Sequence, residues 1–231
     1  MNITKAKSSR IGDVDFDNLI FGTQFSDHML VCTYKDGAWE EPEIKPYGPI
    51  SFTPALHTLH YGQALFEGQK AYYMQDGRVG IFREDMNAKR LNHSARRMFM
   101  PEFPEELFVE GIAELVKIDK AWVPKKKGHS LYLRPFMFGS SEFVAARPSE
   151  EYTFCIIMSP VGPYYSGDVK VKIEETYTRS ASGGVGSTKC AGNYGGAFYA
   201  TNEAKKEGYT QIVWTDHKSH ELIEESGTMN I

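Results

Sequence analysis

The chain has 231 residues, of which 41% are hydrophobic and 24% charged, with a formal net charge of −4. This length suffices for a sizeable core in one large or two small domains, and the composition is that of a globular and not a disordered protein. The 26 basic and 30 acidic residues are scattered along the sequence. That scatter excludes the one-sided basic charge typical of nucleic-acid-binding proteins, so we expect no nucleic-acid partner.

The cysteines and the N-terminal segment indicate the cellular compartment of the protein. The spacing of Cys32, Cys155 and Cys190 is typical of neither a disulfide framework nor a metal site. Residues 1–5 are polar, and no apolar run has the length of a membrane-spanning helix or the pattern of a signal peptide. We therefore expect a cytoplasmic protein without a bound metal or a membrane partner.

The first part of the chain predicts strands and loops. Residues 21–34 mix apolar and polar side chains, and prolines punctuate the stretch that follows, which favours short strands joined by loops. Strand-like runs at 71–74 and 79–82 flank the turn dipeptide Asp76-Gly77, which predicts a β-hairpin.

Apolar residues recur at helical spacing from residue 83 onward. The pattern predicts one helix over 83–100, ended by Pro101, and a second helix over 105–122. Residues 130–138 and 152–158 are rich in aromatic and branched side chains, which predicts strands. Strands followed by two helices and further strands indicate an α+β domain.

The character of the sequence changes after residues 160–167, whose prolines and glycines mark the best candidate for a linker. A glycine-rich turn at 183–192 precedes a helix predicted over 194–207. Branched and aromatic residues predict strands at 210–216 and 221–231.

The domain organisation follows from this change. We expect a small α+β domain at 1–160, an interdomain loop at 161–175 and the beginning of a larger domain at 176–231. Residues 226–231 predict a strand that is just beginning, which is an unusual place for a domain to end. We therefore expect the larger domain to continue in a longer protein.

The glycine-rich segment around Lys189 is the most unusual stretch of the sequence. Glycine lets backbone amides approach an anion closely, so a phosphate-binding loop is one hypothesis. The residue order opposes it, because Ser187 and Thr188 precede the lysine, whereas a Walker loop has Ser or Thr after it. Gly184 and Gly186 fit a dinucleotide fingerprint, but Lys189 occupies the position of its third glycine.

A lysine among small residues suggests carbonyl chemistry instead. A tight, partly desolvated pocket disfavours the ammonium form and leaves a neutral amine that condenses with an aldehyde. The alternative is an ordinary exposed loop lysine, as most lysines are. The local pattern alone leaves both interpretations of Lys189 open.

Sequence blocks along nearly the whole chain resemble those of branched-chain amino-acid aminotransferases, a group of fold-type IV pyridoxal-phosphate enzymes. Each block is moderately specific, and their common order makes chance agreement implausible. The blocks are Phe21-Gly22-Thr23, Asp27-His28-Met29-Leu30, Leu59-His60-Tyr61-Gly62, Leu65-Phe66-Glu67-Gly68, Ser130-Leu131-Tyr132-Leu133-Arg134-Pro135, Gly192-Asn193-Tyr194-Gly195 and Glu225-Ser226-Gly227-Thr228-Met229-Asn230.

The resemblance implies a fold, a reaction and an assembly. The fold would be a small N-terminal α+β domain followed by the beginning of a larger C-terminal α/β pseudobarrel domain. The reaction would be reversible, pyridoxal 5'-phosphate-dependent transfer of the amino group between L-leucine, L-isoleucine or L-valine and 2-oxoglutarate, giving glutamate and branched-chain 2-oxo acids. The assembly would be a homodimer in which Tyr61 reaches the site of the partner subunit.

Several cofactor roles are implied by the matching motifs. Lys189 resembles the lysine that forms the Schiff base with the cofactor and then moves the substrate proton. Tyr194 resembles the tyrosine at the phenolic oxygen, and Arg90 the arginine that binds the phosphate through its forked donors. Thr228 is expected at the phosphate or just behind it. Without the resemblance, Arg90 is predicted to be an ordinary exposed helix arginine.

One of two neighbouring glutamates is expected at the pyridine nitrogen. The family pattern places this carboxylate five residues before the asparagine of the Thr-Met-Asn block, which selects Glu225 from Asn230. Alternation along a strand turns Glu224 to the opposite face. Glu225 is therefore expected to keep the ring nitrogen protonated.

The aromatic blocks resemble the wall around an aliphatic substrate side chain. Such a wall favours burial of leucine, isoleucine and valine side chains over polar ones. Arg134 resembles the arginine that accepts the side-chain carboxylate of glutamate. Core packing is the alternative for each aromatic residue. The residues of the expected wall are Phe21, Tyr61, Phe66, Tyr132 and Tyr164.

Two alternative functions stay open. A D-amino-acid aminotransferase or an aminodeoxychorismate lyase is opposed by the Gly-Asn-Tyr-Gly and Gly-Thr-Met-Asn blocks and by the long N-terminal extension. A non-catalytic truncated paralogue is motivated by the expected missing C-terminal part and opposed by the intact Lys189, Tyr194 and Glu225. Without that part, we expect weak cofactor binding and little turnover. The sequence ranks neither the three branched-chain substrates nor biosynthesis against degradation.

Overall fold

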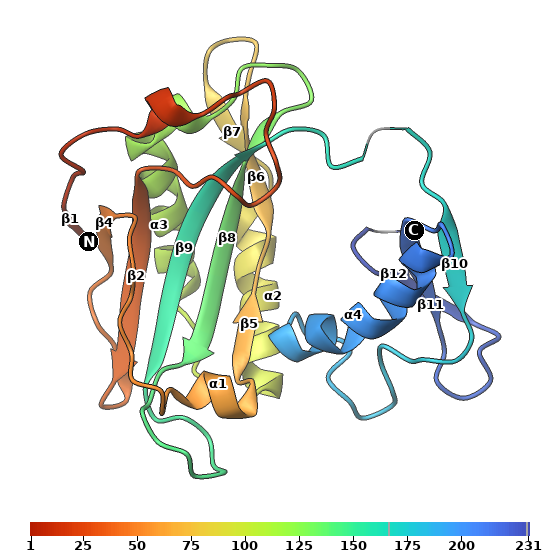
Figure 1. Cartoon of the computed structure of the whole chain (residues 1–231). Coiled ribbons are helices and arrows are strands. Elements are labelled where there is room, and N and C mark those ends of the chain that lie inside the picture. Colours follow the sequence, from red (N-terminus) through yellow and green to blue (C-terminus); the bar gives the residue numbers. More distant parts are fainter. Residues whose placement is uncertain (166, 230) are drawn as a thin grey trace. The chain divides into compact units, whose positions relative to one another are not determined.

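The computed structural model describes residues 1–165, 167–229 and 231, and the chain divides into two compact units, Met1–Tyr164 and Tyr165–Ile231 (Figure 1). Each unit has its own sheet and its own cluster of buried apolar side chains. Within the described residues, no helix combines the length and the apolar character needed to cross a membrane.

Unit Met1–Tyr164 is built on a nine-stranded sheet in the order β1-β4-β2-β9-β8-β6-β7, with β3 paired to β2 and β5 to β8. Strands β1 and β4 are parallel, and the other pairs are antiparallel. The strands are β1 (Asn2–Ile3), β2 (His28–Lys35), β3 (Ala38–Trp39), β4 (Glu43–Pro46), β5 (Ala64–Phe66), β6 (Gln69–Tyr73), β7 (Val79–Ile81), β8 (Ser130–Gly139) and β9 (Tyr152–Val161).

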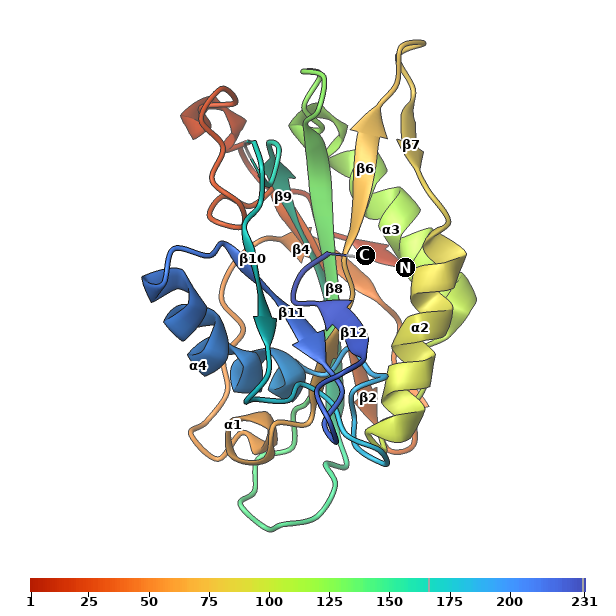
Figure 2. The same ribbon diagram turned by 90° about the vertical axis from the view of Figure 1, so that its right-hand side faces the viewer.

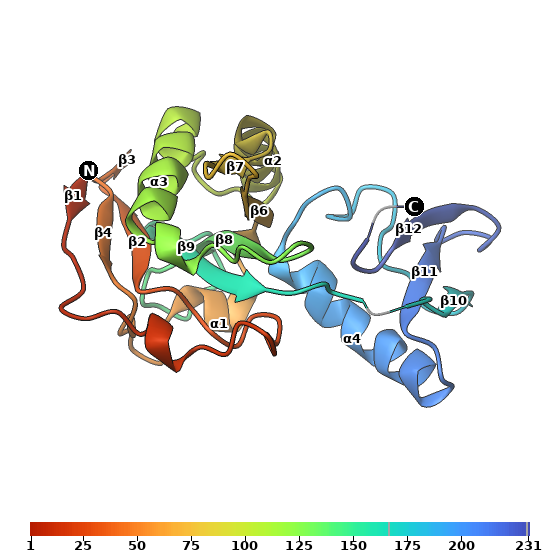
Figure 3. The same ribbon diagram turned by 90° about the horizontal axis from the view of Figure 1, so that it is seen from above.

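The helices of this unit cover the sheet unequally. Helices α2 and α3 lie side by side on one face, and α1 lies toward the other (Figure 3). Apolar side chains such as Leu91 of α2 and Phe108 and Ile112 of α3 join the sheet residues in the main core. The helices are α1 (His57–Tyr61), α2 (Glu84–Arg97) and α3 (Glu105–Ile118), with short 3-10 helices at Ile11–Asp13 and Lys120–Trp122.

Strand β8 determines which side chains reach the face that α2 and α3 do not cover. Leu131, Leu133 and Met137 are completely buried in the core under these helices. Because side chains alternate along a strand, Tyr132 and Arg134 point to the opposite face, where they are only partly buried. The sequence of one strand thus supplies both the core and a polar, aromatic surface.

Unit Tyr165–Ile231 contains a three-stranded sheet in the order β10-β11-β12. Strands β10 (Val171–Glu174) and β11 (Gln211–Thr215) are parallel and are connected through α4 (Ala191–Lys206), whereas β12 (Ile223–Ser226) is antiparallel to β11. Ala200 and Ala204 of α4 pack on Ile212 and Trp214 of β11. Figure 2 shows α4 beside β11. This packing fixes α4 against the sheet.

Most of the elements predicted from sequence are found. Local periodicity was sufficient for them because their apolar residues recur at the spacing of a helix or a strand. The confirmed elements are the β6–β7 hairpin, helices α2, α3 and α4, and strands β8, β9 and β11.

Some predicted bounds are wrong. The helix predicted over 105–122 ends at Ile118, because Asp119 leaves the helical conformation and accepts hydrogen bonds from the backbone N–H and the ring of His28. Helix α4 begins at Ala191, three residues before its predicted start. Strand β12 occupies only part of the predicted strand 221–231, in which Asn230 lies outside the described residues.

Strand β10 lies within residues 161–175, the expected interdomain loop. It belongs to the unit Tyr165–Ile231, in which it pairs with β11 along its whole length. Local sequence carries little sign of this strand, since it is short and its apolar residues alternate with charged ones. Its neighbour β11, far along the chain, supplies the pairing that makes it a strand.

Candidate functional site

Lys189 stands directly before α4, and its side chain reaches toward the beginning of that helix. Its Nζ donates a hydrogen bond of 2.6 Å to the hydroxyl of Tyr194 and lies 5.0 Å from the centre of the Tyr194 ring. The lysine is half-buried. Two predicted site residues therefore meet within one unit, and Lys189 is not an ordinary exposed loop lysine.

The glycine-rich loop before Lys189 is held in shape by bonds to its own carbonyl groups. The hydroxyl of Thr188 donates to the carbonyl of Val185 at 2.7 Å, and the amide of Asn193 donates to the same carbonyl at 3.0 Å. Gly186 approaches Ser180 so closely that an added Cβ would lie 2.2 Å from the Ser180 Cβ. The loop therefore depends on glycine at this position, and it fixes where Lys189 leaves the backbone.

The two neighbouring glutamates of β12 have different partners. Glu225 lies opposite Trp214 of β11, and its Oε1 forms an ion pair with Arg179. Glu224 accepts a hydrogen bond of 2.5 Å from the hydroxyl of Ser180. The strand alternation predicted for this pair is interrupted here, because the register of β11 and β12 shifts between Trp214, opposite Glu225, and Thr215, opposite Ile223. Glu224 lies at this irregularity of the strand.

Arg179 is a functional candidate that sequence motifs did not reveal. Its side chain is 10% exposed, which is low for an arginine. No recognised motif marks this residue, and its partner Glu225 follows 225 − 179 = 46 positions later in the chain. The only signal in the sequence is a lone arginine ahead of the glycine-rich loop.

Thr228 belongs to a small polar group in the same unit. Its hydroxyl shares a hydrogen bond of 2.9 Å with the hydroxyl of Tyr165 and accepts a second bond of 2.9 Å from Nε2 of Gln211. Hydroxyl groups both donate and accept, so this group is chemically suited to bind an oxyanion.

The predicted substrate residues other than Tyr61 gather on one face of unit Met1–Tyr164. Nη2 of Arg134 donates a 3.0 Å hydrogen bond to the hydroxyl of Tyr132, and the guanidinium lies 4.4 Å from the centre of the Phe66 ring. The Phe21 ring packs edge-on against Tyr132 and Tyr164, with ring centres 4.9 and 5.2 Å away. Phe21 is 41% and Tyr164 54% exposed, so these rings are not ordinary core residues.

The glycine after Glu67 makes room for this group. A Cβ at Gly68 would lie 2.3 Å from the hydroxyl oxygen of Tyr132. Any larger residue at this position would therefore displace the Tyr132 hydroxyl that Arg134 binds. The sequence block Phe66-Glu67-Gly68 thus has a steric reason for its glycine.

Tyr61 and Arg90 lie elsewhere in the same unit. Tyr61 is on α1, where its hydroxyl donates a 2.5 Å hydrogen bond to the carbonyl of Val144 and its ring contacts His57. Arg90 is on α2 and forms an ion pair with Glu67. The structure therefore places Tyr61 against another loop and gives Arg90 an acidic partner that no sequence motif indicated.

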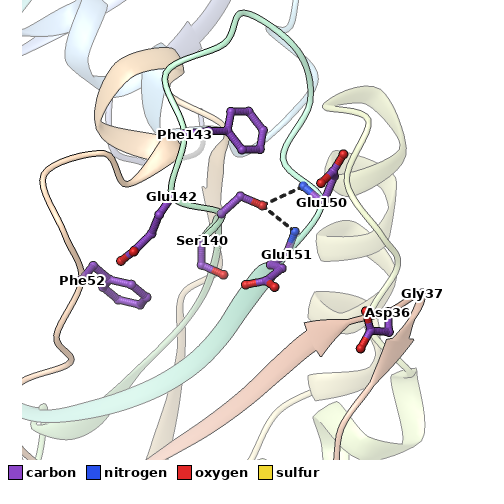
Figure 4. A pocket seen from close by; sticks show the side chains of 9 residues that line it. Asp36, Gly37, Phe52, Ser140, Glu142, Phe143, Glu150 and Glu151 are labelled. Carbon is purple, nitrogen blue, oxygen red and sulfur yellow. Dashed lines mark hydrogen bonds between the residues drawn. The ribbon is translucent and has the colours of Figure 1, made fainter.

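A separate pocket of about 630 Å³ lies beside the loop that joins β8 and β9 (Figure 4). Carboxylates of Asp36, Glu142, Glu150 and Glu151 line it. The hydroxyl of Ser141 accepts hydrogen bonds from the backbone N–H groups of Glu150 and Glu151 and so shapes the loop. The pocket contains none of the predicted site residues, and its acidic lining repels the carboxylates of amino and oxo acids.

The family of the chain follows from a comparison with known proteins. The family model described as amino-transferase class IV matches residues 64–231, more than half of the sequence. The chain belongs to the class IV aminotransferases. The match includes Lys189, Tyr194, Arg179 and Glu225, the residues brought together in the second unit.

Curated relatives of this class IV aminotransferase bear branched-chain names. The chain is 46% identical over 222 residues to branched-chain-amino-acid transaminase 1 of Bacillus subtilis, covering 94% of the chain and 62% of the relative. It is 42% identical over 216 residues to the branched-chain-amino-acid aminotransferase of Mycolicibacterium smegmatis, covering 91% of the chain and 59% of the relative. The chain therefore spans less than two thirds of the length of these relatives.

Solved structures show the same fold. The branched-chain aminotransferase of the thermophilic archaeon Thermoproteus uzoniensis with norvaline superposes with a TM-score of 0.68 at 21% identity, over 87% of this chain and 63% of that one. An aminotransferase of Brucella abortus bound to the cofactor PLP gives a TM-score of 0.60 at 18% identity, over 86% and 66%. The expected fold, that of the fold-type IV aminotransferases, is therefore confirmed.

Proposed function

We propose that the protein containing this chain is a pyridoxal-phosphate-dependent transaminase. It transfers the amino group reversibly between L-leucine, L-isoleucine or L-valine and 2-oxoglutarate, in a homodimer in the cytoplasm. One observation carries the proposal: the Lys189 amine is hydrogen-bonded to the Tyr194 hydroxyl in the same unit in which Arg179 holds Glu225. The branched-chain names of the curated relatives support the substrate class.

The donor set of the second unit fits pyridoxal phosphate. When bound, this cofactor supplies an aldehyde carbon, a phenolic oxygen and a ring nitrogen through which the ring accepts electrons. Lys189 offers a primary amine, Tyr194 a hydroxyl and Glu225 a carboxylate. Oε1 of Glu225 is paired with Arg179, and the side chain is 43% exposed, so the rest of the carboxylate is open to a ring nitrogen.

Lys189 would carry the chemical step as base and acid. Its Nζ takes the proton from the substrate α-carbon and returns it to the neighbouring reacting carbon. The Tyr194 hydroxyl, 2.6 Å away, holds Nζ in one orientation between these two transfers. Glu225 would pair with the protonated ring nitrogen and so stabilise its positive charge. Arg90 and Thr228 are proposed to bind the phosphate.

The aromatic group of the first unit would select the substrate. Phe21, Phe66, Tyr132 and Tyr164 present apolar surface, which favours aliphatic side chains. Arg134, stacked on Phe66, provides a charge that binds the second carboxylate of glutamate and 2-oxoglutarate. We propose that Tyr61 serves the site of the partner subunit, since its contacts lie away from Arg134.

The test begins with the absorbance of the purified protein with pyridoxal phosphate, followed by borohydride reduction and peptide mapping. We expect a visible band and a reduced adduct on Lys189. Lys189→Ala removes both, whereas the control Lys205→Ala, at an exposed position near the end of α4, keeps both. Wild-type protein without an adduct on Lys189 would refute the cofactor assignment.

Amino-group transfer is then measured from each of a series of amino acids to 2-oxoglutarate. We expect glutamate formation from L-leucine, L-isoleucine and L-valine. Efficient transfer from D-alanine, with little from the branched-chain L-amino acids, would favour another enzyme of the same fold. An adduct on Lys189 without transfer from any amino acid would favour a non-catalytic protein.

A further inference from the structure

Arg179 joins three parts of the second unit through one guanidinium group. Its Nη1 forms the ion pair with Oε1 of Glu225 and donates a 3.2 Å hydrogen bond to the carbonyl of Gly186 in the glycine-rich loop. Its central carbon lies 5.9 Å from the centre of the Tyr194 ring, within the range of a cation–π contact. The carboxylate, the loop and the phenol are thus linked by one buried charge.

Arg179 pairs with one of the two oxygens of the Glu225 carboxylate. Arg179 forms its ion pair with Oε1, which is buried. The Glu225 side chain as a whole is nevertheless 43% exposed, so the exposed surface belongs to its atoms other than Oε1. One oxygen is therefore turned to the arginine, and the rest of the carboxylate is accessible to a ligand.

The two neighbouring glutamates are contacted by two neighbouring residues, Arg179 and Ser180. Arg179 binds Glu225, and the next residue, Ser180, donates to Glu224. A guanidinium and a hydroxyl in adjacent positions thus contact two adjacent carboxylates. Glu225 has a charged partner, whereas the partner of Glu224 is a neutral hydroxyl, so the two carboxylates differ in their electrostatic surroundings.

We propose that Arg179 is a positioning residue that sets the orientation and the charge of Glu225 toward the ring nitrogen of pyridoxal phosphate, and couples it to Tyr194. The inference rests on the proposed function. Arg179 offsets part of the negative field of Glu225 at the ring nitrogen and holds the carboxylate in one rotamer. A lysine at this position would keep the charge but lose the planar guanidinium group that lies near the Tyr194 ring while its Nη1 contacts Glu225 and Gly186.

The first experiment compares Arg179→Gln and Arg179→Lys with wild type. Without the positive charge, the field of Glu225 at the cofactor becomes more negative, so protons on the cofactor are held more tightly. In Arg179→Gln we expect the pH midpoint of the visible band to rise by about one unit. We expect kcat to fall by about tenfold or more, with a smaller change in KM. Arg179→Lys should restore most of the midpoint and less of kcat.

A control variant tests whether the loss of any ion pair in this unit has the same effect as the loss of Arg179. Lys172→Gln removes the cation of a surface ion pair with Glu207 in the same unit, and it should leave both the midpoint and kcat unchanged. If Arg179→Gln does not fold, Arg179→Lys carries the comparison. Unchanged midpoint and kcat in a folded Arg179 variant would overturn the inference.

A double-mutant cycle with Glu225→Gln tests whether Arg179 acts through Glu225. Once the carboxylate is gone, Arg179→Gln should add little to the shift of the band. Additive shifts would show that Arg179 acts independently and would overturn the coupling. These outcomes differ from failure of the proposed function, in which the wild-type protein itself forms no adduct on Lys189.

Discussion

Glu67 binds Arg90 side-on through two hydrogen bonds of equal length. Nε of Arg90 donates to Oε1 and Nη2 donates to Oε2, both at 2.7 Å. Asn87, one turn earlier on α2, donates to Oε2 at 2.8 Å. The Glu67 side chain is fully buried, whereas that of Arg90 is 52% exposed. A buried carboxylate therefore fixes the orientation of a partly exposed guanidinium.

Loss of Arg90 should destabilise the first unit more than loss of an ordinary surface arginine. Arg90→Ala leaves the Glu67 carboxylate buried with only neutral donors, which should lower the free energy of unfolding by about 2 kcal/mol or more. Arg96, on the same helix as Arg90, forms an exposed ion pair with Glu102 in the loop that follows, and Arg96→Ala should cost less than about 1 kcal/mol. Urea unfolding without cofactor measures both, and equal losses would contradict the role of the Glu67 pair.

The proposed phosphate role of Arg90 predicts a selective loss of affinity. Arg90→Lys keeps the charge but loses the two hydrogen bonds to Glu67 that orient the guanidinium, so binding of pyridoxal phosphate should weaken by about tenfold. Binding of pyridoxal, which has no phosphate, should be almost unchanged. Titration of the visible band with each compound measures the two affinities. Equal weakening for both compounds would place Arg90 away from the phosphate.

The glycine-rich loop should tolerate alanine at one glycine and not at another. In Gly186→Ala, the new methyl group would lie 2.2 Å from the Ser180 Cβ, so the loop must shift, at a cost of about 1–3 kcal/mol. Gly192, in the first turn of α4, has no atom within 4 Å of the added Cβ. Gly192→Ala should therefore be neutral or slightly stabilising. Thermal unfolding compares the two, and a neutral Gly186→Ala would show that the contact is easily relieved.

Stability should fall in alkaline solution because buried acids stay protonated in the fold. Burial raises the pKa of the Cys32 and Cys155 thiols from 9.0 to about 12, and that of the Tyr152 hydroxyl from 10.0 to about 12. The unfolded chain releases these protons first, so the free energy of unfolding should decline as pH rises from about 9 toward 12.

Urea unfolding at a series of pH values measures this decline. Cys155→Ala removes one of the ionising groups and should make the slope above pH 9 shallower. Cys190→Ala, which removes a buried thiol from the second unit, controls for the loss of a buried side chain as such. A slope unchanged by Cys155→Ala would contradict the assignment of the decline to this thiol.

Local sequence was enough for the elements whose pattern repeats within a few residues. The hairpin around Asp76-Gly77 and the helix α2 follow from turn chemistry and apolar spacing, which act between near neighbours. The bounds of an element differ from the prediction where a distant residue intervenes. Helix α3 ends at Ile118 because Asp119 binds His28, which lies 91 positions away in the chain.

The candidate site was predictable where a motif holds its residues close in sequence. Lys189 and Tyr194 are five residues apart, so the start of one helix brings them together. The spacing of a sequence block selects Glu225 over Glu224, whereas the alternation expected along the strand is interrupted at Glu224 by a register shift. The roles of the predicted site residues stay predictions, to be tested by the adduct and the affinity measurements.

The sequence by itself determined the family, the helices and strands with clear periodicity, and the lysine before α4. Only the tertiary structure decided that Arg179 contacts Glu225 and that Glu67 binds Arg90. Ion pairs of this kind join residues that are far apart in the sequence and meet only when the chain folds back. No local sequence pattern indicates which residues will meet. Burial then makes each charge require its partner, because water no longer solvates it.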